Sequence, residues 1–456
     1  MKIANKKVTA ERLVKDALEK AKHFEDYHIF TFIDEDGALA RAREIDAKIA
    51  RGEDAGRLAG VPYALKDNFL SARGETTASA HILEGFNSPV IATSVAKLEA
   101  EGAIMIGRTN MDAFAHGSST ENSYYGPTLN SADQERVAGG SSGGSAVAVA
   151  LDIVEFATGT DTGGSIRQPA SFNGIYGLKP TYGTISRYGV VAMASSTDCV
   201  GFFTKTPEDM DLLMSIASGQ DPKDMTTLPD YYNKSEVQKV HKIGVIKDFD
   251  NDSVHPEIRK ALKQKCDLLR KKGHEIVELE MPALKYGLAA YYILVPAELC
   301  SNLSRHDGVR YGFRSDNSRD LDSLYENTRN EGFMPENKRR IMIGNFVLSS
   351  GFYDAYFLKA AKARTLIVQE YANAFEKCDF ILTPVSPNPA FKLGEKVDDP
   401  VAMYLEDVMS VSLNLAGVPG LAIPAGKTPE GLPIGLQLVG PRRSDKALIE
   451  FAKELQ

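Results

Sequence analysis

The chain has 456 residues and a net charge of −8, with 43% hydrophobic and 25% charged residues. These values are ordinary for a globular protein with a sizeable core, and the acidic balance argues against a large basic surface that binds nucleic acid alone. The four cysteines have no C-x-x-C spacing, so neither a zinc site nor a disulfide framework is expected. The N-terminal segment lacks the apolar core of a signal peptide and no apolar run approaches the length of a membrane span, so we expect a cytoplasmic protein.

The N-terminal part alternates between helix-like and strand-like patterns. Apolar residues at helical spacing predict helices at 8–25, 38–51 and 93–102. Short apolar runs predict strands at 28–33, 61–65 and 103–107. Such alternation is typical of α/β layering. We therefore predict an α/β fold in which residues 1–456 form a single domain.

Lys66 directly follows the predicted strand 61–65, so its stem is expected to be buried. Burial disfavours the ammonium form and lowers the pKa of a lysine. To act as a base near neutral pH, its pKa must fall about three units from roughly 10.4, which corresponds to about 4 kcal/mol. For a lone lysine at this position, a solvated charge at a strand end is the ordinary alternative.

Two loops rich in glycine and serine lie between residues 137 and 170. Residues 139–144 (GGSSGG) form the first loop and residues 162–165 (TGGS) form the second. Between them, 145–153 predicts a short buried helix and 155–160 predicts a strand. An isolated GGSSGG is typical of a flexible linker, but two such loops around an apolar segment are not. The second loop follows the carboxyl end of a strand, where ligands bind in open α/β sheets.

The second loop has the composition of an oxyanion-binding turn. Gly163 and Gly164 allow the backbone N–H groups around Thr162 to Ser165 to point into one concavity, and Ser165 ends the turn. A nucleophilic serine needs a base, and none of the eight histidines lies in a triad-like motif. Lysine is the other known base, which makes Lys66 the candidate.

Three segments together resemble the amidase signature family: ALKDN at 64–68, GGSSGGSA at 139–146 and GTDTGGSIRQPA at 159–170. The resemblance implies a large mixed β-sheet covered by helices on both faces. It implies Ser165 as the nucleophile, Ser141 as a bridging serine and Lys66 as the base. It also implies an oxyanion hole at Thr162, Gly163 and Gly164, and a cis peptide bond between Gly140 and Ser141.

Two further segments resemble one branch of this family, the tRNA-dependent amidotransferases. They are GSSTENS with GPTLN at 117–130, and GLKPTYGTISRYGVVAMASSTDCVG at 177–201. His116 precedes the first segment, and a structural hydrogen-bonding role is expected for it. The signature core is placed at about 60–210.

The C-terminal half continues the α/β pattern. A helix is expected to start at 206–209, with Thr206 as its N-cap and Pro207 at its first position. Strands are predicted at 242–249, 274–280, 379–384 and 432–440, and helices at 256–272, 338–348 and 352–377. The aromatic residues of the last two helices are expected in the core. Residues 221–240 are interpreted as a surface connection and 303–336 as a long loop on the substrate or partner side.

The resemblance also implies a pocket for free glutamine, within about 285–420. Arg340 is expected to pair with the α-carboxylate, Asp407 with the α-ammonium, and Tyr291 to line the pocket. Arg339 and Tyr292 are the neighbours that a one-residue shift in alignment would select instead.

The resemblance implies the glutaminase component of a tRNA-dependent amidotransferase. Such a component supplies ammonia to a partner that converts Glu-tRNA(Gln) to Gln-tRNA(Gln), with Asp-tRNA(Asn) as a second acceptor. The expected assembly is a heterotrimer with subunits B and C, in which the B subunit binds ATP, magnesium and most of the tRNA. No P-loop and no metal-ligand cluster is present in this sequence. A stand-alone amidase acting on small amides is the alternative, and a non-catalytic scaffold is a third hypothesis.

Overall fold

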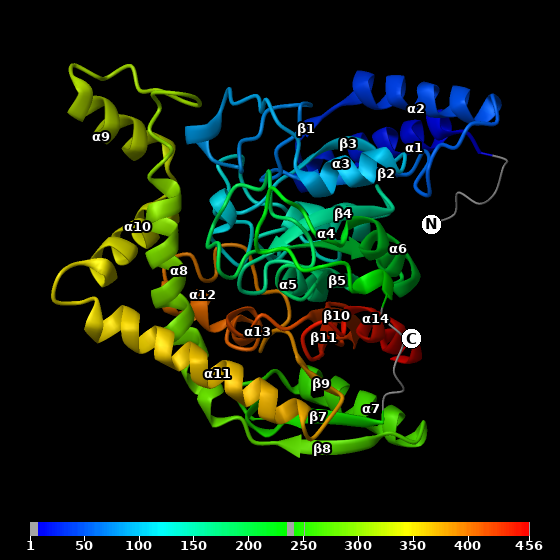
Figure 1. Cartoon of the computed structure of the whole chain (residues 1–456), viewed down its shortest axis with the longest axis vertical. Coiled ribbons are helices and arrows are strands. Elements are labelled where there is room, and N and C mark those ends of the chain that lie inside the picture. The colour runs from blue at the N-terminus through cyan, green and yellow to red at the C-terminus, as the bar shows by residue number, and fades with distance from the viewer. Residues whose placement is uncertain (1–7, 235–240, 250, 456) are drawn as a thin grey trace.

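The computed structural model describes residues 8–234, 241–249 and 251–455 (Figure 1). Its strands are β1 (Phe30–Ile33), β2 (Pro62–Lys66), β3 (Ile104–Thr109), β4 (Phe156–Asp161), β5 (Tyr176–Lys179), β6 (Cys199–Thr204), β7 (Lys242–Ile246), β8 (Glu275–Leu279), β9 (Phe380–Pro384), β10 (Gly420–Lys427) and β11 (Pro433–Val439). They form one 11-stranded sheet in the order β1-β3-β2-β4-β6-β5-β10-β11-β9-β7-β8. Strand β2 pairs in parallel with β3 and β4, and β7 with β8 and β9, while the other pairs are antiparallel. The sheet is therefore mixed, as predicted.

Helices cover both faces of this sheet. They are α1 (Ala10–His23), α2 (Glu35–Ala50), α3 (Thr93–Ala100), α4 (Gly143–Ala150), α5 (Arg167–Asn173), α6 (Pro207–Ala217), α7 (Pro256–Lys271), α8 (Gly287–Leu303), α9 (Leu321–Gly332), α10 (Pro335–Leu348), α11 (Lys359–Phe375), α12 (Pro400–Leu405), α13 (Val411–Ala416) and α14 (Asp445–Ala452). Because side chains alternate along a strand, β2 sends Ala64 into one apolar cluster with α1, α2 and α4, and Tyr63 and Leu65 into another with α3 and α6. This confirms the predicted fold class.

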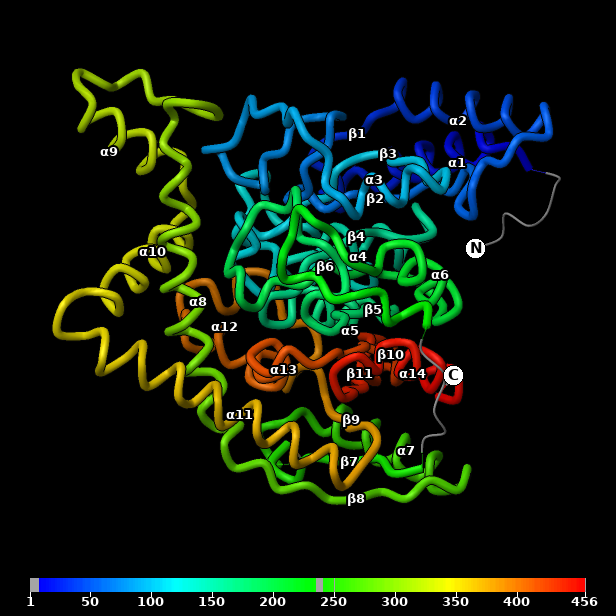
Figure 2. The backbone as a smooth tube through the Cα atoms, viewed as in Figure 1, coloured from blue at the N-terminus to red at the C-terminus, as the bar shows by residue number. Residues whose placement is uncertain are grey.

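Several predicted elements are present with small shifts in their ends. Helix α6 begins as expected, because the Thr206 hydroxyl accepts a hydrogen bond from the N–H of Asp209 and Pro207 occupies the first turn. Strands β7 and β8 are parallel neighbours joined by α7, which confirms the predicted β-α-β unit. Helices α8 to α11 lie together on the side of the sheet away from both chain ends (Figures 1 and 2).

The prediction of a long loop at 303–336 is wrong. Helix α9 occupies Leu321–Gly332 and α10 starts at Pro335. The side chains of Asp320 and Ser323 form a reciprocal capping box at the start of α9. Each side chain accepts a hydrogen bond from the backbone N–H of the other residue, and these N–H groups have no partner within the helix. Few residues of α9 are buried, which is why its apolar periodicity is weak.

Two other interpretations need correction. Residues 221–234 are not a simple surface connection, because Asp221 and Asp224 are buried and accept hydrogen bonds from Ser186 and Arg187 respectively. Residues 235–240 of the same segment lie outside the described residues.

The aromatic residues of the α10 and α11 region are not uniformly in the core. Tyr371 is buried, but the rings of Phe346, Phe352, Tyr353 and Tyr356 are exposed.

The first glycine-rich loop is also shorter than predicted, since Gly143 and Gly144 already belong to α4. Strands β2 and β4 run in parallel, with Tyr63 opposite Phe156 and Ala64 opposite Ala157. Their carboxyl ends therefore meet at one edge of the sheet, and the backbone N–H of Lys66 donates to the Thr158 hydroxyl at 3.0 Å. This register brings Lys66 beside the second loop. None of the described helices combines the length and apolar character needed to cross a membrane.

Candidate active site

Lys66 is fully buried at the end of β2, as the sequence predicts. Its Nζ lies 2.9 Å from Ser141 Oγ, 2.9 Å from Thr160 Oγ1 and 3.5 Å from the Thr160 carbonyl oxygen. Burial lowers the pKa of Lys66 to about 7, against the opposing influence of Asp112, Asp161 and Asp198. A large share of Lys66 is therefore uncharged at neutral pH.

The three partners of Nζ suit a neutral amine. A neutral amine donates two hydrogen bonds, and both Thr160 oxygens are acceptors placed for them. Its lone pair is then left to accept the hydroxyl proton of Ser141. Asn68 Nδ2 also donates to Thr160 Oγ1, at 3.0 Å, which holds the threonine side chain in place. Sequence reasoning misses Thr160 as a site residue, because a β-branched residue in a strand is usually chosen for packing.

The two glycine-rich loops meet at the serines. The Ser142 N–H donates to the Ser165 carbonyl oxygen at 3.3 Å, and the peptide bond between Gly140 and Ser141 is cis. Ser165 is 7% exposed, and its hydroxyl has no hydrogen-bond partner within the described parts of the chain. The contact from Lys66 to Ser141 is thus present, whereas transfer between the Ser141 and Ser165 hydroxyls stays a prediction. Such contacts often tighten only when substrate binds.

Asp161 holds the second loop in shape. Its carboxylate accepts hydrogen bonds from the N–H groups of Gly164 and Ile166 at 2.9 and 3.1 Å, and from the guanidinium of Arg167 at 3.0 Å. Burial raises the pKa of this carboxyl, but Arg167, Lys179 and Asn414 together outweigh burial and bring the pKa down to about 2. Asp161 is therefore a fixed charge that organises the turn.

This arrangement corrects one part of the predicted oxyanion hole. The N–H of Gly164 is already donated to Asp161 and is not free for a ligand. The N–H groups of Thr162, Gly163 and Ser165 have no hydrogen-bond partner among the residues that the structure describes. These three N–H groups are the available donors.

Both glycines of the turn are required by close contacts. A Cβ at Gly163 would lie 2.5 Å from the Tyr291 hydroxyl oxygen, and one at Gly164 would lie 2.6 Å from Ser410 Oγ. Gly164 also has a φ of +140°, which side chains disfavour. The Ser410 hydroxyl lies against the carbonyl oxygens of Gly163 and Asp407, so the turn is connected to the predicted glutamine pocket.

Asp407 and Tyr291 both lie at this site. The Asp407 carboxylate is buried and accepts hydrogen bonds from the Ser118 hydroxyl at 2.9 Å and from the Tyr292 hydroxyl at 2.8 Å. Burial raises the pKa of Asp407 to about 7. Tyr291 packs against Gly163, while its neighbour Tyr292 contacts Asp407 directly. The structure therefore brings both tyrosines to the site.

Arg340 lies in the wall of a pocket of about 280 Å³. Its side chain is buried, and its guanidinium carbon lies 5.2 and 5.6 Å from the ring centroids of Tyr292 and Tyr404, which stack on each other. Its Nε donates to Glu336 at 2.8 Å, and its two terminal nitrogens have no hydrogen-bond partner among the described residues. Arg339 lines the same pocket, but nearly half of its side chain is exposed. The geometry therefore favours Arg340 over Arg339.

The same pocket borders the catalytic side of the molecule. Asp112, Gly117 and Ser118 also line it, and the Asp112 N–H donates to the Ser141 carbonyl oxygen at 3.2 Å. Ser118, which contacts Asp407, lies in the segment GSSTENS that resembles the amidotransferase branch. The resemblance of this segment could have identified Ser118 as a site residue, but the sequence cannot show that its hydroxyl contacts Asp407.

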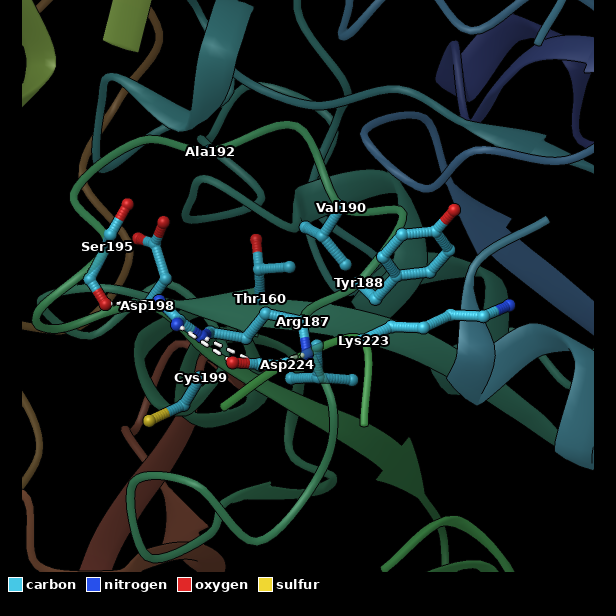
Figure 3. A pocket seen from close by; sticks show the side chains of 11 residues that line it. Thr160, Arg187, Tyr188, Val190, Ala192, Ser195, Asp198, Cys199, Lys223 and Asp224 are labelled. Carbon is cyan, nitrogen blue, oxygen red and sulfur yellow. Dashed lines mark hydrogen bonds and ion pairs between the residues drawn. The ribbon is translucent and has the colours of Figure 1, made fainter. Parts of the chain in front are cut away.

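Thr160 lines a second pocket (Figure 3). Arg187 forms an ion pair with Asp224 in its wall, and Asp198 accepts a hydrogen bond from the Thr162 hydroxyl at 2.6 Å. None of the residues predicted to bind glutamine lines this pocket. Two of its wall residues, Thr160 and Asp198, contact Lys66 and Thr162 respectively.

Comparison with known proteins places the whole chain in one group. The family model described as Amidase matches residues 12–449. The A subunit of glutamyl-tRNA(Gln) amidotransferase from a Cyanothece species is 48% identical over 444 residues, which cover 96% of this chain and 92% of that protein. The protein of the same name from Carboxydothermus hydrogenoformans is 48% identical over 457 residues, covering 99% and 94%.

A solved structure agrees with these sequence comparisons. The crystal structure of the A subunit of glutamyl-tRNA(Gln) amidotransferase from Thermotoga maritima has a TM-score of 0.81 and 38% identity, and the match covers 98% of this chain and 91% of that one. The signature residues, the fold and the length of the match therefore agree. The chain belongs to the amidase signature family.

Proposed function

We propose that this chain is the glutaminase component of a tRNA-dependent amidotransferase. The observation that carries the proposal is the hydrogen bond between buried Lys66 and Ser141, next to a pocket that presents Arg340. Relatives named as the A subunit of glutamyl-tRNA(Gln) amidotransferase, matched over nearly their full length, support the choice of substrate.

In the proposed reaction, neutral Lys66 accepts the proton of Ser141 while Ser141 takes the proton of Ser165. The Ser165 oxygen attacks the side-chain amide carbon of glutamine, and the free N–H groups of the turn stabilise the oxyanion that forms. The proton returns through Ser141 to the amide nitrogen, which leaves as ammonia. Water then hydrolyses the glutamyl ester and restores Ser165.

Donor selection follows from two charges: Arg340 in the pocket wall, and Asp407, which accepts a hydrogen bond from the pocket residue Ser118. Arg340 pairs with the α-carboxylate of glutamine through its unbonded terminal nitrogens, and Asp407 pairs with the α-ammonium. Tyr291 lines the wall between the turn and the pocket. The two charges fix the orientation that presents the side-chain amide to Ser165.

The ammonia is consumed by partners. We place ATP, magnesium and most of the tRNA on the B subunit, with the C subunit completing a heterotrimer that amidates Glu-tRNA(Gln) and, as a second acceptor, Asp-tRNA(Asn). Affinity purification followed by mass spectrometry should recover both partners with this chain. Recovery of the chain alone, together with rapid turnover of unrelated small amides, would favour the stand-alone amidase instead.

Glutamine hydrolysis should depend on pH through two groups. Lys66 must be uncharged to accept a proton and Asp407 must be charged to bind the ammonium, and the pKa of each is about 7. Both requirements are lost as the pH falls through 7. We expect kcat/KM to fall by up to about 100-fold per pH unit below 6, because both groups titrate in the free enzyme. We expect kcat to fall by only about tenfold per pH unit, because bound glutamine keeps Asp407 charged and only Lys66 titrates.

Steady-state profiles of the assembled enzyme between pH 5 and 9 check this expectation. Asp407→Asn should reduce the acid slope of kcat/KM to that of kcat. A kcat that stays flat down to pH 5 would show that Lys66 does not act as the titrating base.

Arg340→Ala should lower kcat/KM for glutamine by about 100-fold, because the substrate carboxylate loses a charge-assisted partner in a buried site. Arg339→Ala is the matched control, since its exposed ion pair with Glu336 contributes little. If Arg340→Ala leaves glutamine hydrolysis untouched, the glutamine pocket is misplaced. The stand-alone amidase then becomes the better description.

A further inference from the structure

His116 lines the pocket that contains Arg340 and has an unused polar atom. The residue is fully buried. Its Nε2 is a buried atom without a hydrogen-bond partner in the described structure. A buried polar atom without a partner is unfavourable unless a ligand or water meets it. The structural hydrogen-bonding role expected from the sequence involves other atoms of His116 and leaves Nε2 unused.

Asn337 fixes the tautomer of His116. The Asn337 amide nitrogen donates to the Ala113 carbonyl oxygen at 2.9 Å, and its amide oxygen accepts from the Met334 N–H at 3.2 Å. These two backbone contacts set the orientation of the amide, so its nitrogen must be the donor to His116 Nδ1, at 2.6 Å. Nδ1 then carries no proton. The ring proton of a neutral His116 is on Nε2.

His116 stays neutral in this position. Burial and the positive charge of Arg340 both lower its pKa well below the usual range. The Nε2 atom is therefore a neutral N–H donor next to a guanidinium group. The pocket also contains Arg339, Lys396 and the carboxylates Asp112, Glu121 and Glu336, but the part of it formed by Arg340 and His116 pairs a cation with an N–H donor. Such a pair suits an anion with several oxygen acceptors.

We propose that His116 Nε2–H is the second donor to the α-carboxylate of the donor substrate, beside Arg340. This inference rests on the proposed function. Arg340 supplies the charge, and His116 supplies a directional hydrogen bond. A substrate that has no acceptor atom in place of the α-carboxylate cannot accept this hydrogen bond. His116 is thereby a specificity-determining residue for α-amino acid amides over simple amides.

The test compares two substrates in the assembled enzyme: glutamine and 4-aminobutanamide, which is glutamine without its α-carboxyl group. His116→Met removes the donor and fills the space with a flexible apolar side chain. We expect kcat/KM for glutamine to fall about ten- to hundred-fold, with a change of less than about threefold for 4-aminobutanamide. His116→Gln, whose amide can donate from a similar position, should restore most of the glutamine activity.

The outcomes test the role of His116 separately from the proposed glutaminase function. Equal losses on both substrates, or no loss on glutamine, would overturn the role of His116 alone. A wild-type complex that cannot hydrolyse glutamine would overturn the proposed function and this inference with it. His116→Phe provides a second donor-free variant should His116→Met fail to fold, and the same ratio between the two substrates decides the result.

Discussion

Ser165→Ala is expected to abolish glutamine hydrolysis by the assembled enzyme, with a loss in kcat of about 10⁴-fold or more. The proposed reaction has no second nucleophile, because the ester forms on the Ser165 oxygen at the end of the oxyanion turn. Amidation of charged tRNA with added ammonium salt should continue, since that step belongs to the partner. Parallel assays with glutamine and with ammonium salt measure the two activities.

Ser142→Ala is the matched control for this variant. Ser142 is a buried neighbour of Ser141, and its hydroxyl donates to the Thr160 carbonyl oxygen at 3.3 Å. Ser142→Ala removes a hydroxyl of the same loop that takes no part in the proposed proton transfer, so we expect kcat to fall by less than about tenfold. Loss of both activities in Ser165→Ala would mean that the substitution damaged assembly. Substantial glutaminase activity in that variant would exclude Ser165 as the nucleophile.

Lys66→Met should lower kcat for glutamine by about 10⁴-fold without unfolding the protein. Methionine keeps an unbranched stem in the buried position and removes the only amine within reach of Ser141 among the described residues. Because burying an amine is itself unfavourable, the melting temperature should stay the same or rise. Steady-state kinetics and thermal denaturation of the same preparation give both values.

Lys179→Met is a matched control from within the same fold. Lys179 is also fully buried with its pKa lowered by burial, but its Nζ donates to the Pro180 carbonyl oxygen and has no contact with the serines. Glutaminase activity should therefore survive Lys179→Met. If Lys66→Met keeps more than about a tenth of the wild-type kcat, an amine base is not required.

Much of the fold and of the candidate site could be predicted because the signals are local. The strand that ends at Lys66, the two glycine-rich loops and the start of α6 at Thr206 are each read from a few consecutive residues, and the structure contains all of them. The resemblance to the amidase signature family added the proposed roles of Lys66, Ser141 and Ser165. It also added the cis peptide bond at Gly140 and Ser141, which is present.

What the sequence could not provide depends on contacts between distant residues. Arg167 meets Asn414 and Gln437, which are more than 200 positions away in the chain, and no local pattern indicates such a pairing. The role of Asp161 in occupying the Gly164 N–H likewise needs the folded turn. The sequence indicates only a structural role for His116, because the free N–H on its ring is revealed by the orientation of Asn337.

Trapping the covalent intermediate tests the central claim most directly. The assembled enzyme is mixed with glutamine, quenched in acid within the first turnover, digested and analysed by mass spectrometry. We expect a glutamyl ester on the peptide that contains Ser165, and its absence in Ser165→Ala. A glutamyl adduct on another residue, or no adduct in an enzyme that releases ammonia from glutamine, would contradict the mechanism.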